Sequence, residues 1–207
     1  MNEFLQDVLR LLSPGSRVLL IANNPSLSAK DFHSLGIKSP DVVVQFNLCV
    51  HAQQFSTTDA RRIFIFSSNH LNSAFGFAKD GEPEGEVKRL LDDRERIDAL
   101  AITNVKPPSV VAALARYNLE VQPRLLRLSD VPGFVYPKSK YPSVGYLAFC
   151  VFQSLEDCFG NTSDYPFFIY CVGFTGRTYD LHEEIHHDFV YERTMIQRST
   201  AICYLSP

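Results

Sequence analysis

The sequence has no tryptophan, two methionines, no run of lysine and arginine, and no long uninterrupted apolar stretch. With a formal net charge of −3, the chain has no basic field for the nonspecific binding of nucleic acid. The longest apolar candidate, residues 144–155, is shorter than the roughly 18 residues that span a bilayer. Acids near the N-terminus replace the positive charge of a signal peptide. We therefore predict a cytoplasmic protein with no transmembrane segment and no nucleic-acid partner.

The remaining composition is that of a compact globular protein. Hydrophobic residues make up 45% of the chain and charged residues 21%, which excludes disorder, collagen-like repeats and a coiled coil. A length of 207 residues predicts one domain covering residues 1–207.

The five cysteines are odd in number and lack the CxxC spacing of metal or redox motifs. They are Cys49, Cys150, Cys158, Cys171 and Cys203. Most have apolar neighbours, which favours buried, reduced thiols over a disulfide framework.

Short apolar runs alternate with amphipathic segments along the chain. Strands are expected at 17–22, 41–46, 63–66, 100–103, 167–172 and 201–205, and helices at 3–12, 84–93, 108–117, 144–159 and 181–198. This alternation predicts an α/β protein with a mostly parallel sheet and helices on both faces. Ligands of such sheets bind beyond the carboxyl ends of the strands, so the residues that follow each strand are the first candidates.

Asparagine follows three of the expected strands. Asn23 and Asn24 follow the first, Asn47 the second and Asn69 the third. Asparagine is also a common turn and cap residue, so each position alone fits a simple strand terminator. The repetition favours a shared, uncharged pocket with hydrogen-bond donors and acceptors.

Ser143 precedes the long apolar segment 144–159 and is a candidate N-cap. Helix N–H groups near Gly145 would then face a ligand at the positive end of the helix dipole, a geometry that receives phosphate or carboxylate. An ordinary cap without a ligand has the same sequence.

The densest cluster of ionisable groups lies at 178–192. His182 and His186 fit the H-E-x-x-H zinc pattern, although no third ligand is evident. Alternatively, His187 is a general base with Glu192 as a capping or orienting partner, because imidazole titrates near neutrality. A solvated helix surface is the third possibility.

Together these segments resemble the sialylmotifs of glycosyltransferase family 29, and the first also resembles the bacterial sialyltransferases of family 42. The matching segments are RVLLIANNPSL at 17–27 with DVVVQFN at 41–47, PSVG at 142–145 with IYCVGF at 169–174, and HDFVYE at 187–192. The last fits the H-x-x-x-x-E motif. The resemblance covers about residues 17–192.

The resemblance implies a Rossmann-like fold and a transferase that uses a cytidine monophosphate (CMP) sugar without a metal or other cofactor. Asn23 or Asn24, Asn47 and, in the bacterial pattern only, Asn69 would contact the nucleotide. Ser143 and Gly145 would hold the donor, and His187 would activate a hydroxyl of a glycan or other acceptor for inverting displacement. Tyr179 or His182 would stabilise the departing phosphate.

The chain departs from the family pattern in several places. Ala22 replaces a usual glycine, Val144 a common threonine, and the spacing from Tyr179 to His187 is short. The length also leaves little room for a lid, whose absence would favour hydrolysis of the donor or no transfer. The alternatives are a noncatalytic module that binds a nucleotide or sugar phosphate, and a zinc hydrolase that uses the HEEIH segment at 182–186.

Overall fold

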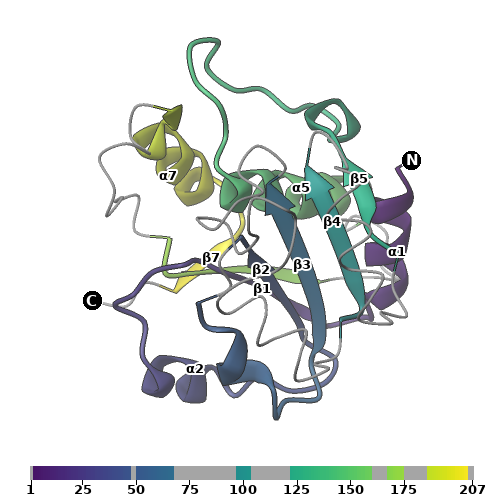
Figure 1. The fold of residues 1–207 in the computed structure, drawn as a ribbon, viewed down its shortest axis with the longest axis vertical. Coiled ribbons are helices and arrows are strands. Elements are labelled where there is room, and N and C mark those ends of the chain that lie inside the picture. Colours follow the sequence, from purple (N-terminus) through teal and green to yellow (C-terminus); the bar gives the residue numbers. More distant parts are fainter. Residues whose placement is uncertain are drawn as a thin grey trace, which may run out of the picture.

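Parallel strands form the centre of the protein (Figure 1). The computed structural model describes residues 2–47, 50–67, 97–103, 122–159, 167–174 and 186–204. The strands within these ranges are β1 (Arg17–Ile21), β2 (Val42–Phe46), β3 (Arg61–Ser67), β4 (Ala99–Thr103), β5 (Arg124–Leu126), β6 (Phe168–Val172) and β7 (Ile202–Tyr204). All their pairings are parallel, so the predicted α/β fold, Rossmann-like with a mostly parallel sheet, is confirmed.

The order of the strands is β5-β4-β3-β2-β1-β6-β7. The chain moves outward from β1 to β5 and then returns to place β6 on the other side of β1. In β1, Leu20 is in register with Val44 of β2 and with Cys171 of β6. The direction of winding therefore reverses between β1 and β6.

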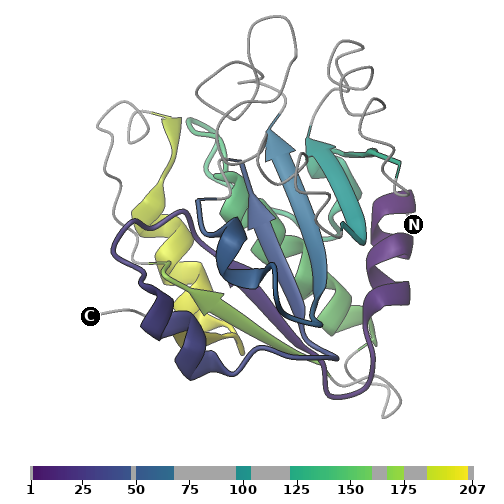
Figure 2. The ribbon, with the colours of Figure 1, turned by 60° about the horizontal axis from the view of Figure 1, so that its bottom comes forward.

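The helices cover both faces of this sheet, as predicted. They are α1 (Glu3–Leu11), α2 (Ala29–Leu35), α5 (Val144–Phe159) and α7 (Phe189–Arg198), with the 3-10 turns η1 (Ala52–Phe55) and η4 (Leu128–Asp130). The apolar cores place α1, α5 and α7 on one face and α2 with η1 on the other. Figure 2 shows α5 behind the strands and α2 in front of them. Right-handed crossovers that run in opposite directions require this division.

Side chains along β1 point alternately to the two faces of the sheet, so successive residues belong to different apolar cores. Val18 and Leu20 pack on the side of α1 and α5, whereas Leu19 and Ile21 pack against α2. All four are at most 1% exposed. A strand buried on both faces reads as a continuous apolar run, which is why the sequence predicts it well.

Helix α5 is the central helix of its face and has the predicted bounds. Its apolar residues surround the helix, and it packs on β1, β2, β3 and β6. It has 16 residues, and none of the helices in the described ranges is long and apolar enough to cross a membrane.

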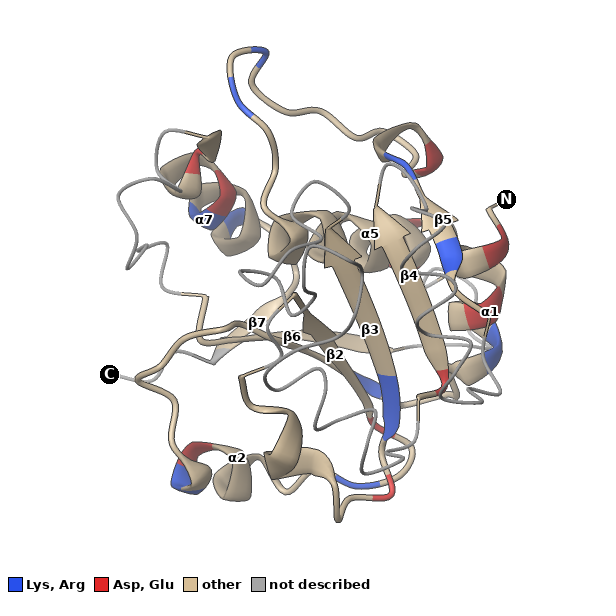
Figure 3. Cartoon of the chain, viewed as in Figure 1, with Lys and Arg blue, Asp and Glu red and all other residues tan. Residues whose placement is uncertain are grey.

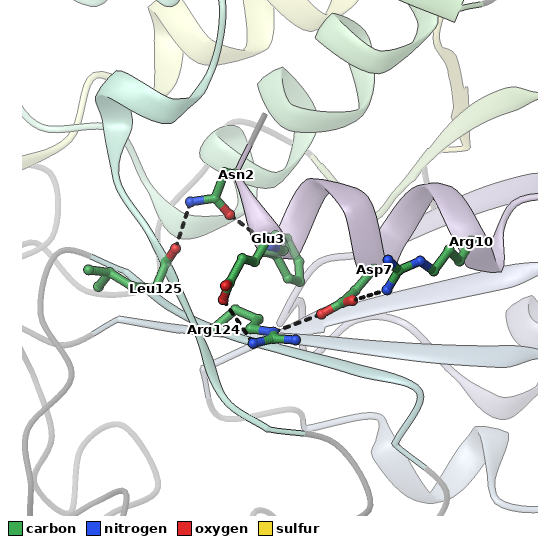
Figure 4. A network of polar contacts seen from close by, with 7 residues as sticks. Asn2, Glu3, Asp7, Arg10, Arg124 and Leu125 are labelled. Carbon is green, nitrogen blue, oxygen red and sulfur yellow. Dashed lines mark hydrogen bonds and ion pairs between the residues drawn. The ribbon is translucent and has the colours of Figure 1, made fainter.

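Helix α1 is fastened to the edge strand β5 by polar contacts (Figure 4). Arg124 donates to Glu3 at 2.8 Å and to Asp7 at 2.9 Å, and the Asn2 amide donates to the carbonyl of Leu125 at 2.9 Å. Asn2 also caps α1 by accepting from the Phe4 N–H. These bonds hold α1 beside β5, the outermost strand on that side of the sheet.

The expected helix at 181–198 differs from the structure. Helix α7 begins at Phe189, and His187 and Asp188 are not helical. Asp188 is instead the N-cap, and its carboxylate accepts from the N–H of Tyr191 at 3.0 Å. The other expected elements in the described ranges agree within one residue at each end, except that the strand expected at 63–66 begins two residues earlier, at Arg61, and extends to Ser67. The helices expected at 84–93 and 108–117 lie outside the described residues.

The cysteines in the described residues are free thiols, as predicted, but their burial varies. Cys171 is buried, Cys150 and Cys203 are partly buried, and Cys158 is exposed. The expectation of a buried thiol is therefore wrong for Cys158, which lies in the last turn of α5 facing solvent. Cys49 lies outside the described residues.

Candidate functional site

The carboxyl ends of the parallel strands share one edge of the sheet, which in Figure 2 runs from β3 and β4 at the top toward β6 at the left. In open parallel sheets ligands bind at this edge, in the crevice where the winding reverses. Here the reversal lies between β1 and β6, so the candidate site is formed by the segments that follow these two strands.

Asn24 joins the two segments at the reversal. Its amide donates to the carbonyl of Gly173, just beyond β6, at 3.1 Å. Its oxygen accepts from the N–H and hydroxyl of Ser26, at 3.0 and 2.7 Å. Because Asn24 is only 3% exposed and makes these bonds inside the protein, it holds the loop after β1 against the segment that leaves β6.

Gly173 permits the close approach of the two segments. Its φ is +76°, which favours glycine, and an added Cβ would lie 2.7 Å from Cδ1 of Leu27. The loop after β1 therefore packs directly on the backbone that leaves β6.

Asn23 and Asn47 connect the ends of the neighbouring strands. The Asn23 amide donates to the carbonyl of Phe46 at 2.8 Å, which ties the end of β1 to that of β2. Asn47 has a φ of +52°, a left-handed conformation that asparagine tolerates, and its oxygen accepts from the N–H of Ser67 at 2.9 Å. The predicted row of asparagines is thus present at one edge, although Asn69 lies outside the described residues.

In the residues that the structure describes, the ends of β3 and β4 at this edge carry no charged side chain. The charged residues of β3, Arg61 and Arg62, lie at the amino end of the strand, and Asp98 precedes β4. Figure 3 shows the carboxyl parts of β3 and β4 without charged residues, while acidic and basic residues lie mostly on the outer helices and loops. A ligand at this edge would meet amides, backbone N–H groups and aromatic rings.

The N-terminus of α5 lies against the same edge. Ser143 is the N-cap, as predicted: its hydroxyl accepts from the N–H of Tyr146 at 3.1 Å, and its carbonyl accepts from the N–H of Leu147 at 2.9 Å. The N–H groups of Val144 and Gly145 precede the first intrahelical bonds. They are the groups of α5 that could bind an anion.

Gly145 allows α5 to approach the strand ends closely. An added Cβ would lie 3.0 Å from the ring of Phe174 and 3.2 Å from that of Phe46. Phe174 follows Gly173, and Phe46 precedes Asn47. These contacts connect the helix N-terminus with the row of asparagines.

Glu192 holds α7 against α5. Its carboxylate accepts from the Ser143 N–H at 2.7 Å, from the Ser143 hydroxyl at 2.6 Å and from the Tyr136 hydroxyl at 2.8 Å. Glu192 is 5% exposed, and burial raises its pKa, while the bonds from Ser143 and Tyr136 and the nearby His187 act in the opposite direction. The hydrogen bonds of Glu192 in the described residues thus fix the two helices, and His187 acts on it electrostatically.

His187 immediately precedes the N-cap of α7. Its Nδ1 lies 2.8 Å from the carbonyl oxygen of Tyr141. A carbonyl only accepts, so Nδ1 carries the hydrogen and, in the neutral ring, Nε2 carries the lone pair. This is the tautomer that a general base at Nε2 requires.

His51 is a further titratable group at the edge, beyond those expected from the sequence. Its Nε2 lies 2.9 Å from the carbonyl oxygen of Asn24, and its ring packs on Phe32 with centroids 5.0 Å apart. Burial lowers the pKa of His51, which favours a neutral ring. A lone histidine in a loop has no spacing signal, so only the fold reveals this position.

The structure brings most of the expected site residues to one edge. Ser143 and Glu192 are in direct contact, and Gly145 reaches the asparagines through Phe46 and Phe174. Tyr179 and His182 lie outside the described residues. The sequence also carries no signal for Tyr136 and Tyr141, which lie in an irregular segment without periodicity.

Within the described residues there is no group of three metal-ligating side chains. His186 is exposed, and the remainder of the HEEIH segment lies outside those residues.

Comparison of the chain with family models, curated proteins and solved structures finds no significant match.

The contacts of Glu192 predict different effects for two substitutions. Glu192→Ala leaves the Ser143 and Tyr136 donors without their acceptor and should lower the free energy of unfolding by about 2–4 kcal/mol. Glu192→Gln should cost about 1 kcal/mol or less, because the amide oxygen can accept from Ser143 N–H and Tyr136 while the amide nitrogen donates to the Ser143 oxygen. Denaturant unfolding measures both, and equal losses would contradict the assigned contacts.

Glu192 also predicts a pH dependence. Because burial raises its pKa above the ordinary value of 4.5, the folded state binds this proton more tightly than the unfolded state. Its contribution to stability is therefore greatest below pH 4.5 and is lost as pH rises through the raised pKa. Unfolding of the wild type and Glu192→Gln from about pH 4 to 8 should show the wild type losing stability relative to the variant. A relative gain would contradict the raised pKa.

Proposed function

We propose that the protein is a sialyltransferase-like glycosyltransferase. It transfers a sugar from a CMP-sugar donor to an acceptor hydroxyl, with inversion and without a metal, and His187 is its general base. The observation that carries this proposal is the bond from His187 Nδ1 to the carbonyl of Tyr141, which leaves the lone pair of the neutral ring on Nε2. Tyr141 lies two residues before Ser143, the N-cap of α5. The resemblance of three segments to the sialylmotifs supports the choice of donor.

We propose that the donor nucleotide binds where the direction of winding reverses, between β1 and β6. Asn23 uses one amide hydrogen for the carbonyl of Phe46, and the second is the donor offered to the nucleotide. The backbone N–H groups of Val144 and Gly145 receive the phosphate at the positive end of α5. The Ser143 hydroxyl already donates to Glu192, so Ser143 acts mainly by capping the helix.

In the transfer step, Nε2 of His187 removes the proton of the acceptor hydroxyl. The oxygen attacks the anomeric carbon, the bond from that carbon to the phosphate oxygen breaks, and CMP leaves with the electron pair. Attack from the side opposite the leaving group inverts the anomeric carbon. The N–H groups at the start of α5 stabilise the negative charge that develops on the phosphate.

The first test of the proposal is nucleotide binding. Calorimetry should show CMP binding to the full chain, and Asn23→Asp should weaken it about tenfold or more, because a carboxylate faces the phosphate and the amide donor is lost. Asn2→Asp makes the same chemical change beside the edge strand β5 and should leave the affinity within about twofold. A wild type that binds neither CMP nor any other nucleotide contradicts the proposal.

The second test concerns catalysis. His187→Ala should lower donor turnover by about 10²–10⁴-fold and leave the Kd for CMP within about twofold, because a general base acts on the chemical step. His33→Ala, an exposed histidine on α2, is the control and should change neither quantity. A parallel loss of CMP binding in His187→Ala would assign His187 to binding or folding.

A noncatalytic module that binds a nucleotide or sugar phosphate is the second candidate. The bonds that Asn24 and Ser143 make within the protein favour this candidate. Both side chains donate to protein groups and support the strand ends, so they contribute less to a catalytic site for a substrate. Nucleotide binding without transfer or hydrolysis of any CMP-sugar would select this candidate.

A further inference from the structure

The hydroxyl of Tyr136 joins two groups at the start of α7. It donates to the carboxylate of Glu192 at 2.8 Å and accepts from the backbone N–H of Asp188 at 2.9 Å. The pKa of Tyr136 is raised, mainly by burial. The phenol therefore remains neutral and keeps the proton that it donates to Glu192.

The segment 136–141 holds the backbone on both sides of His187. The N–H of Tyr141 donates to the carbonyl of His186 at 2.9 Å, and Nζ of Lys140 donates to the carbonyl of His187 at 3.2 Å. The Tyr136 hydroxyl binds the next backbone group, the N–H of Asp188. Three successive residues of the main chain are thus held by one irregular segment.

We propose that Tyr136 is a positioning residue for His187, an inference that rests on the proposed function. The N–H of Asp188 and the carbonyl of His187 belong to one peptide plane, which Tyr136 and Lys140 bind on its two sides. The bond from the Tyr141 N–H to the carbonyl of His186 holds the preceding plane. With the peptide planes on both sides of its Cα held, the direction in which the His187 side chain leaves the backbone is fixed. The ring can then keep its Nδ1 bond to Tyr141 and hold Nε2 in one place.

The contacts of the Tyr136 hydroxyl show that it does not bind the imidazole of His187 directly, which distinguishes a positioning residue from a catalytic one. The phenol oxygen is engaged by Asp188 and Glu192, whereas the imidazole of His187 is bonded to the carbonyl of Tyr141. Tyr136 therefore acts through the backbone and does not exchange a proton with His187. Small displacements of a reacting group cost large factors in rate, so such a support has a measurable effect.

Tyr136→Phe and Tyr191→Phe form a matched pair of variants. Tyr191 also links the irregular segment to α7, through a bond of 3.2 Å to the carbonyl of Val135. The rings of Tyr136 and Tyr191 are in contact, with centroids 5.4 Å apart. Each substitution removes one hydroxyl from the same aromatic cluster, but only Tyr136→Phe frees the N–H of Asp188.

The experiment compares kcat for donor turnover with the Kd for CMP in the full-length variants. Tyr136→Phe should lower kcat about 10–100-fold with the Kd within about twofold, and Tyr191→Phe should leave both within about threefold. Nitrogen NMR of the histidine rings gives a second readout. His187 should be the Nδ1–H tautomer in the wild type and in Tyr191→Phe, and a mixture of tautomers in Tyr136→Phe.

Three results would contradict the positioning role. Equal losses of kcat in the two variants, or a Tyr136→Phe chain that does not fold, would assign the hydroxyl to stability. A wild-type His187 that is not the Nδ1–H tautomer would remove the geometry that Tyr136 is proposed to support, whatever the variants do. If the wild type turns over no CMP-sugar, the proposed function fails, while the tautomer comparison still decides whether Tyr136 positions the ring.

Discussion

The buried carboxylate of Glu192 is the interaction on which the C-terminal third of the protein depends. A carboxylate that is 5% exposed is costly unless donors surround it, and Ser143 and Tyr136 provide three. One side chain of α7 thereby holds the N-terminus of α5 and the segment before it. His187 lies five residues earlier in the chain, so its position follows from this anchor. The same carboxylate that supports the candidate base thus also makes stability depend on pH.

At the sheet edge, some polar side chains hold the backbone in place and others are candidates for ligand binding. Asn24 and Asn47 bind backbone groups of neighbouring segments and so determine where the strands end. Under the proposed function, recognition would fall to Asn23, to the first N–H groups of α5 and to the rings beside Gly145. These groups would bind an anion through their dipoles. The near-neutral charge of the chain is consistent with this arrangement.

Strands β1 to β4 and the central helix were predictable because each is a continuous apolar run with one dominant pattern, whereas the short elements α2 and β5 were not expected from the sequence. Strands β1 to β4 are almost wholly buried and α5 is buried along most of its length, so local sequence predicts them. The start of α7 depends on distant contacts: the 136–141 segment binds the backbone at His186, His187 and Asp188 and interrupts the helical pattern. Asn23, Asn47 and Ser143 were found because they adjoin predictable elements. Tyr136 and His51 were not, since their partners lie 27 to 56 residues away.

The bond between Asn24 and Gly173 spans 149 positions of the chain, and the Ser143–Glu192 bond spans 49. Contacts between such distant positions require long loops to close, which costs conformational entropy, so we expect them to form after the local contacts of β1 and β2. The β1–β2 unit can pair while the ribosome is still synthesising the remainder, but the candidate site requires β6 and α7. A ligand of this site would bind only the completely folded chain and would stabilise it by mass action. Binding would therefore also report whether the last segments of the chain have docked.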